Sequence, residues 1–207
     1  MPLHRRVYLK ATGVAATVGV AGCLGARSAA TGTLSTSVTD QPGDIGDFES
    51  CVVTIQGIWI KPHGDNDEQD ARAGPEANGD GIVEQSEGDI DRGEGRTYYE
   101  FDEPQEADLV DLQNGNTQLI DDREVPVGGY EFLQLDVTEV NGVLEGGEAA
   151  TVETPGNAPL QFKQRFEIRE GQRTTFVADF TPVRRGRTGR YLLQPVATGT
   201  AVVYEEG

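Results

Sequence analysis

The strongest constraint on the fold is the spacing of apolar residues, which recur every second residue in many short segments. Phe176, Ala178 and Phe180 follow this spacing, and so do Leu133, Leu135 and Val137. A period of two places side chains on one face of a β-strand. No segment after residue 23 keeps a helical period. Short strands separated by turn residues therefore predict an all-β domain, a sandwich or a barrel.

Turn residues divide the expected strands. A strand over 51–60 would place Cys51, Val53, Ile55 and Trp59 on one face. Pro104 is expected to separate a strand over 98–101 from one over 107–112, and the pair Asn141-Gly142 predicts a hairpin turn. The other expected strands are 34–38, 120–125, 130–140, 162–168, 174–180, 191–198 and 200–204.

One segment interrupts this pattern. Residues 64–95 contain few apolar residues and many Asp, Glu and Gly. The segment is far longer than a usual hairpin loop, so we expect either a functional loop or a solvated acidic insertion.

The first residues are typical of an export signal. Arg5-Arg6 followed by Val, Tyr, Leu and Lys fits a twin-arginine signal, and a short apolar run over 11–22 follows. The run ends in Val-Ala-Gly before Cys23, which fits the lipobox of exported lipoproteins. We therefore expect a signal peptide over 1–22, a flexible tether over 23–32 and a β-sandwich over 33–207. A lipid on Cys23 would hold the domain at the outer face of the cell membrane.

The composition is strongly acidic. The chain has 35 Asp and Glu against 17 Lys and Arg, a formal net charge of −18, and only three lysines. An acid-rich, lysine-poor surface is typical of halophilic proteins, which stay hydrated where salt screens charge. The same charge argues against a nucleic-acid partner, because phosphates are bound by Lys and Arg clusters. If Cys23 carries lipid, Cys51 has no partner, and we expect a buried thiol there.

The motifs also resemble an uncharacterised family of exported prokaryotic lipoprotein domains, domain of unknown function "forty-three eighty-two", in a form like that of haloarchaea. The resemblance covers roughly Leu34 to Val203. The segments that carry it are 37–40 with Pro42, 53–60, 110–115, 125–130 with Leu133 and Leu135, Asp179-Phe180, and 193–196. The family implies an immunoglobulin-like or transthyretin-like β-sandwich and supplies no catalytic residues.

Catalytic chemistry has little support in the sequence. His63 is the only histidine after residue 22, and it lies between Pro62 and Gly64, as a loop residue would. No cluster of Cys or His suggests zinc. The aromatic residues are expected mostly in the core, although an exposed binding patch is the alternative; they are Tyr98, Tyr99, Phe101, Tyr130, Phe132 and Tyr191. One basic cluster, Arg184-Arg185-Gly186-Arg187 with Arg190, could dock an anionic partner, or could be a solvated hairpin tip whose charges offset nearby acids.

A calcium loop is the one metal site that the pattern indicates. Residues 76–87 place oxygen-bearing groups at the spacing of an EF-hand loop, with Gly81 at the bend. The expected ligands are Glu76, Asn78, Asp80, the Ile82 carbonyl, Glu84 and Glu87. Glu in place of Asp at the first position, and Pro75 before the loop, depart from that pattern. A solvated acidic loop is the alternative.

Three hypotheses follow from the sequence. The first is a non-enzymatic, lipid-anchored surface module that binds a protein or glycan partner or organises the envelope. The second is an accessory lipoprotein that binds calcium or a solute through the acidic loop. The third is a small extracytoplasmic hydrolase.

Overall fold

The structure, a computed structural model, describes residues 29–41, 43–64 and 79–205. Arg5, Arg6 and Cys23 lie outside these ranges. Within them the chain forms eleven strands and three short 3-10 helices, and none of its helices is long and apolar enough to cross a membrane. The elements are β1 (Thr31–Thr39), η1 (Asp44–Asp47), β2 (Phe48–Pro62), η3 (Glu87–Asp89), β3 (Thr97–Asp108), β4 (Gln118–Pro126), β5 (Gly128–Leu144), β6 (Ala149–Glu153), η4 (Pro155–Asn157), β7 (Leu160–Phe162), β8 (Phe166–Ile168), β9 (Arg173–Arg184), β10 (Arg190–Pro195) and β11 (Ala201–Tyr204).

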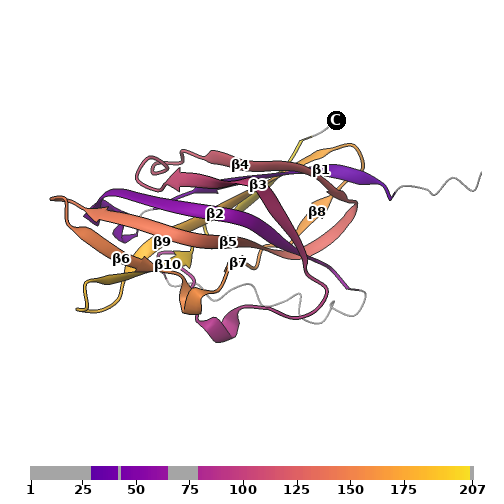
Figure 1. The fold of residues 1–207 in the computed structure, drawn as a ribbon. Helices are drawn as coiled ribbons and strands as arrows, with labels where there is room; N and C mark the ends of the chain where they lie inside the picture. The colour runs from indigo at the N-terminus through magenta and orange to yellow at the C-terminus, as the bar shows by residue number, and fades with distance from the viewer. Residues whose placement is uncertain (1–28, 42, 65–78, 206–207) are drawn as a thin grey trace, which may run out of the picture.

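The strands form two packed layers that are joined along one side (Figure 1). Hydrogen-bonded neighbours follow the order β3-β2-β5-β6-β10-β9-β1-β4, with β11 beside β9 and with β7 and β8 beside β5. The layer of β2, β3 and β5 faces the layer of β1, β4 and β9, and the parallel pair of β6 and β10 connects them. The all-β sandwich predicted from the sequence is therefore confirmed.

Strand β1 lies inside its layer and not at an edge. It pairs antiparallel with β4 on one side and parallel with β9 on the other, from Thr33 opposite Arg173 to Thr39 opposite Asp179. The strand begins at Thr31, two residues before the expected start of the sandwich at residue 33.

Aromatic side chains fill the space between the layers. Phe176 on β9 meets the rings of Phe162 and Phe166 edge-on, with ring centroids 6.3 and 5.3 Å apart, and Phe166 stacks on Tyr130 at 5.1 Å. Such pairs stabilise a core beyond the area that they bury. Of the six aromatic residues singled out in the sequence, four are buried and two are half-buried; the buried ones are Phe101, Tyr130, Phe132 and Tyr191.

The prediction that Trp59 shares a face with Cys51, Val53 and Ile55 was wrong. Cys51, Val53 and Ile55 are fully buried as expected, but the pairing register of β2 shifts between Ile55 and Gly57. An extra residue in one strand reverses which face the following side chains occupy. Ile58 and Ile60 therefore point into the core, and Trp59 points outward.

One strand, β3, runs through Pro104 from Thr97 to Asp108 where two were predicted, but its pairing with β2 is interrupted between Glu100 and Gln105. This strand lies at the edge of its layer, where a residue without an N–H group removes no necessary ladder bond. The strand ends at Asp108, so residues 109–112 form turns, although a strand over 107–112 was expected.

The pair Asn141-Gly142 lies within β5 and makes no turn, contrary to prediction. A Cβ on Gly142 would come 2.9 Å from the Phe48 ring and 3.0 Å from Val152, so glycine allows close packing there. The turn falls three residues later, where Gly146 and Gly147 have φ angles of +107° and +84°. Glycine adopts such angles at little cost.

Cys51 is a buried free thiol, as predicted. Burial, with the nearby Asp108 and Asp40 carboxyls, raises the pKa of the thiol to about 12. The neutral thiol therefore packs as a small apolar group.

Candidate functional site

The second half of the acidic segment 64–95 is docked on the sandwich. The amide of Val83 donates to the carbonyl of Pro195 at 2.8 Å, and that of Ala197 donates to the Gly81 carbonyl at 2.9 Å. Ile82 and Ile90 are both buried. Residues 79–95 are thus a packed loop with two apolar anchors.

Four buried glutamines fasten this loop to the strands: Gln85 from the loop, Gln134 on β5, Gln161 on β7 and Gln194 on β10. The amide of Gln85 donates to the Gln194 side chain at 2.6 Å, and its own side chain exchanges hydrogen bonds with the backbone of Gln161. Amide side chains both donate and accept, so they satisfy loop and strand groups where water is excluded.

Gln134 holds the far end of the same loop. Its side-chain amide donates to the Asp91 carbonyl at 2.8 Å and to the Gln161 side chain at 2.7 Å, and its oxygen accepts from Arg96 at 2.7 Å. Lys61 adds an ion pair to the Asp91 carboxylate at 2.8 Å, and this hydrogen bond raises the pKa of Lys61. The loop is therefore positioned by specific polar contacts.

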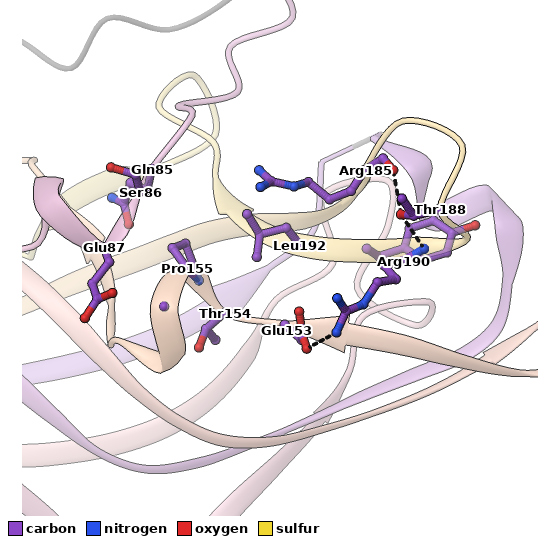
Figure 2. Close-up of a pocket in the computed structure, with 12 residues that line it drawn as sticks. Gln85, Ser86, Glu87, Glu153, Thr154, Pro155, Arg185, Thr188, Arg190 and Leu192 are labelled. Carbon is purple, nitrogen blue, oxygen red and sulfur yellow. Dashed lines mark hydrogen bonds and ion pairs between the residues drawn. The ribbon is translucent and has the colours of Figure 1, made fainter.

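A cleft of about 520 Å³ opens between the docked loop and the β9–β10 hairpin (Figure 2). The loop forms one wall, the end of β6 with η4 forms the floor, and the hairpin forms the other wall. Its lining residues are Gln85, Ser86, Glu87, Glu153, Thr154, Pro155, Gly156, Arg185, Thr188, Arg190, Tyr191 and Leu192.

The floor depends on one glycine. Gly156 has a φ of +59°, and a Cβ there would come 2.5 Å from the Glu87 side chain. Glu87 pairs with Arg92 at 3.1 Å, and η3 begins with a capping box between Ser86 and Asp89. These contacts fix the loop wall where it meets η4.

The arginines of the hairpin differ in their partners. Arg190 pairs with Glu153 at 2.7 Å, and Arg184 pairs with Asp47 at 2.8 Å. Among the described residues, the Arg185 side chain has no ion-pair or hydrogen-bond partner. Figure 2 shows it extended over Leu192 toward Gln85 and Ser86. The interpretation of the cluster as a tip whose charges are offset by acids therefore fits Arg184 and Arg190 but not Arg185.

The cleft combines groups suited to a polar anionic ligand. A free guanidinium presents paired N–H donors to a carboxylate or sulfate. Thr154 and Thr188 offer hydroxyl groups, and Leu192 and Pro155 add apolar surface. Pockets of this kind fix the orientation of a ligand through a few placed polar groups.

The structure describes only part of the predicted calcium loop, since Glu76 and Asn78 lie outside the described residues. Of the rest, the Asp80 carboxylate accepts a 3.3 Å hydrogen bond from the Ile82 amide, Glu84 is exposed and Glu87 is paired with Arg92. Within the described part of the chain, no three acidic, His or Cys side chains form a group suited to a metal ion. Calcium binding by the loop stays a prediction.

His63 lies at the end of β2, with Nδ1 3.6 Å from a carboxylate oxygen of Glu131, and it does not line the cleft. Sequence reasoning singled out the hairpin arginines but missed the glutamines that position the opposite wall. The available signal was a polar amide in otherwise apolar strand segments, as at Gln161 between Leu160 and Phe162.

Comparison with known proteins supports the resemblance found in the motifs. The family model described as Domain of unknown function (DUF4382) matches residues 31–195. The chain belongs to this family. No curated protein and no solved structure gives a significant match.

The DUF4382 match begins with β1 and ends with β10. It therefore includes every residue that lines the cleft, whereas β11 lies beyond it. The cleft is a feature of the DUF4382 domain of this chain, built from the second half of the acidic segment and the hairpin at the end of β9.

Proposed function

We propose that this protein is a non-enzymatic surface lipoprotein whose sandwich binds an acidic glycan in the cleft between the docked loop and the β9–β10 hairpin. The supporting observation is Arg185, which lines a polar cleft without a partner among the described residues, in a chain of net charge −18. The other arginine that lines the cleft, Arg190, is paired with Glu153, so Arg185 is the group available to an anionic ligand.

The chemistry of the walls favours a sugar over a simple ion. A uronate or sulfated saccharide offers one anionic group for Arg185 and several hydroxyls for Thr188 and Thr154. Its C–H faces would pack on Leu192 and Pro155. In concentrated salt, where the Debye length is about 3 Å, long-range attraction is screened. Recognition would then depend on direct, paired hydrogen bonds of the kind that arginine makes.

The location of this activity is part of the proposal. Arg5-Arg6 would send the chain through the twin-arginine route, and a lipid on Cys23 would hold the domain at the outer face of the membrane. A tether ending near residue 30 would leave the opposite end of the sandwich, with the cleft, directed away from the lipid.

Titration calorimetry in molar potassium chloride tests the proposal. The full chain should bind oligosaccharides of a uronic acid and bind the matching neutral oligosaccharides at least about tenfold more weakly, the loss of one charged hydrogen bond. Arg185→Gln should remove that difference. Arg187→Gln is the matched control, because Arg187 lies on the same hairpin but does not line the cleft. The proposal would be refuted if the Arg185→Gln variant bound the acidic sugars as tightly as the unaltered chain does. It would also be refuted if the unaltered chain showed no preference for the acidic sugars.

A further inference from the structure

Buried oxygen atoms gather where β1 ends beside β9. Asp40 is the first residue after β1, and Asp179 and Thr181 lie two residues apart on one face of β9. All three residues have 0% exposure. Both carboxylate oxygens of Asp40, Oδ2 of Asp179 and Oγ1 of Thr181 have no hydrogen-bond partner in the described part of the chain.

Two loops enclose these oxygens. The amide of Gln41 donates to Oδ1 of Asp179 at 2.9 Å, which places the chain after β1 directly over β9. From the other side, a Cβ on Gly199 would come within 1.6 Å of Oδ2 of Asp179, and a Cβ on Gly43 would come 2.6 Å from Oγ1 of Thr181. Glycine at these two positions lets the backbone close over the carboxyl groups.

The enclosed carboxyl groups have no matching cation among the described residues. Ionised carboxylates are costly to bury unless they are paired. No lysine or arginine among the described residues bonds to either carboxyl group. Both oxygens of Asp40 and Oδ2 of Asp179 have no partner there, and Oδ1 of Asp179 accepts from the Gln41 amide. A bound cation or a proton must therefore neutralise the pair.

We propose that Asp40, Asp179 and Thr181 supply ligands to a buried calcium ion that ties the end of β1 to β9. The free groups are all oxygens, which calcium and magnesium prefer over the nitrogen and sulfur ligands of transition metals. Magnesium usually keeps several waters, which an enclosed site does not favour. Calcium takes six to eight oxygens, and backbone carbonyls would complete the set.

This site differs from the loop over 76–87 in place and in role. It lies at the junction of β1, β9 and the β10–β11 connection, so a calcium ion there would stabilise the sandwich. The Ala197 amide of that connection donates to the Gly81 carbonyl, so the acidic loop touches this junction but supplies none of the three side chains. The site is also independent of the glycan cleft, whose lining residues include none of these three.

The test measures calcium content and thermal unfolding of the full chain in molar potassium chloride, before and after treatment with a chelator. We expect one calcium per chain, a lower Tm after chelation, and recovery with calcium but not with magnesium. Asp179→Asn and Asp40→Asn keep the side-chain volume. Each should lower calcium affinity by at least about tenfold, a loss seen even for partners of metal ligands. Asp80→Ala with Glu87→Ala, in the acidic loop, is the matched control and should leave affinity unchanged.

Three results would overturn the proposal. One is a protein without calcium whose Tm does not respond to millimolar calcium. Another is a rise in Tm for Asp40→Asn or Asp179→Asn, which would show that the pair shares a proton. The third is loss of calcium only in the loop variant. If the Asn variants do not fold, hydrogen exchange of the unaltered chain decides, because calcium should protect the amides of Asp40, Gln41 and Gly43 and not those of residues 84–88.

Discussion

Replacing Gln134 by leucine should release the acidic loop from the sandwich without unfolding the core. The change removes hydrogen bonds to the Asp91 carbonyl, to the Gln161 side chain and to Arg96. Two of these bonds are between neutral groups, at about 1 kcal/mol each, and the bond to Arg96 contributes about 2 kcal/mol. The free energy that holds the loop on the sandwich therefore falls by on the order of 4 kcal/mol in this variant. The Asp91 carbonyl is then left without this partner in a site from which water is largely excluded.

Hydrogen exchange measured by mass spectrometry follows this release directly. A loss of about 4 kcal/mol corresponds to an increase of up to about a thousandfold in the exchange of amides over 79–95, limited by the opening that the loop already undergoes. Amides of β9 should keep their protection, because the aromatic core around Phe176 is untouched. Gln105→Leu on β3 is the matched control, since that side chain bonds only to the neighbouring Glu103 carbonyl. Unchanged exchange over 79–95 in the Gln134→Leu variant would refute the role given to the glutamines, and so would simultaneous loss of protection in β9.

Four further predictions concern the whole chain. Changing Arg5 and Arg6 to lysine should leave the precursor in the cytoplasm, and cell fractionation showing efficient export would remove the twin-arginine interpretation. Cys23→Ser should appear in the medium or remain unprocessed, so an unchanged membrane fraction would point to another anchor. Lowering salt from about 1 M to about 0.01 M lengthens the Debye length from about 3 to about 30 Å, and circular dichroism should show loss of cooperative β-structure; an identical spectrum would contradict a halophilic surface. The Cys51 thiol, whose raised pKa of about 12 keeps it neutral, should resist alkylation at pH 8 until the chain unfolds, and rapid labelling of the folded protein would show that the site is open.

The sequence predicted the layers best where alternation was uninterrupted. Phe176, Ala178 and Phe180 keep one face along β9, and all three are fully buried. The predictions failed where one extra residue in a strand exchanged the buried and exposed faces, as between Ile55 and Gly57. The residue types at such a bulge do not distinguish it from a regular strand. The prediction of a turn at Asn141-Gly142 failed for a different reason. A sequence does not distinguish a glycine that allows close packing from a glycine that makes a turn.

The sites were harder to predict, because they depend on which loop covers which strand. Asp179 lies on the face of β9 opposite the core residues Phe176, Ala178 and Phe180. Alternation alone would therefore predict that it is exposed to solvent. It is buried because Gln41 and the loop at Gly199 close over it. Gln161 and Gln134 are hidden in the same way under the second half of the acidic segment. The composition of that segment indicated either a functional loop or a solvated insertion, whereas Ile82, Ile90 and the glutamines dock its second half on the strands.

The position of β1 has a mechanical consequence. Its first residue lies beside the start of β9, and the parallel pairing leads to the opposite end of the molecule, where Arg185 follows the last residue of β9 (Figure 1). A pull between the N-terminal end and a ligand held in the cleft would act along both strands in opposite directions. The bonds between β1 and β9 would then bear the load together in shear, as would those to β4, and would not open one after another. A domain connected in this way resists detachment far better than one whose first strand can be peeled from an edge.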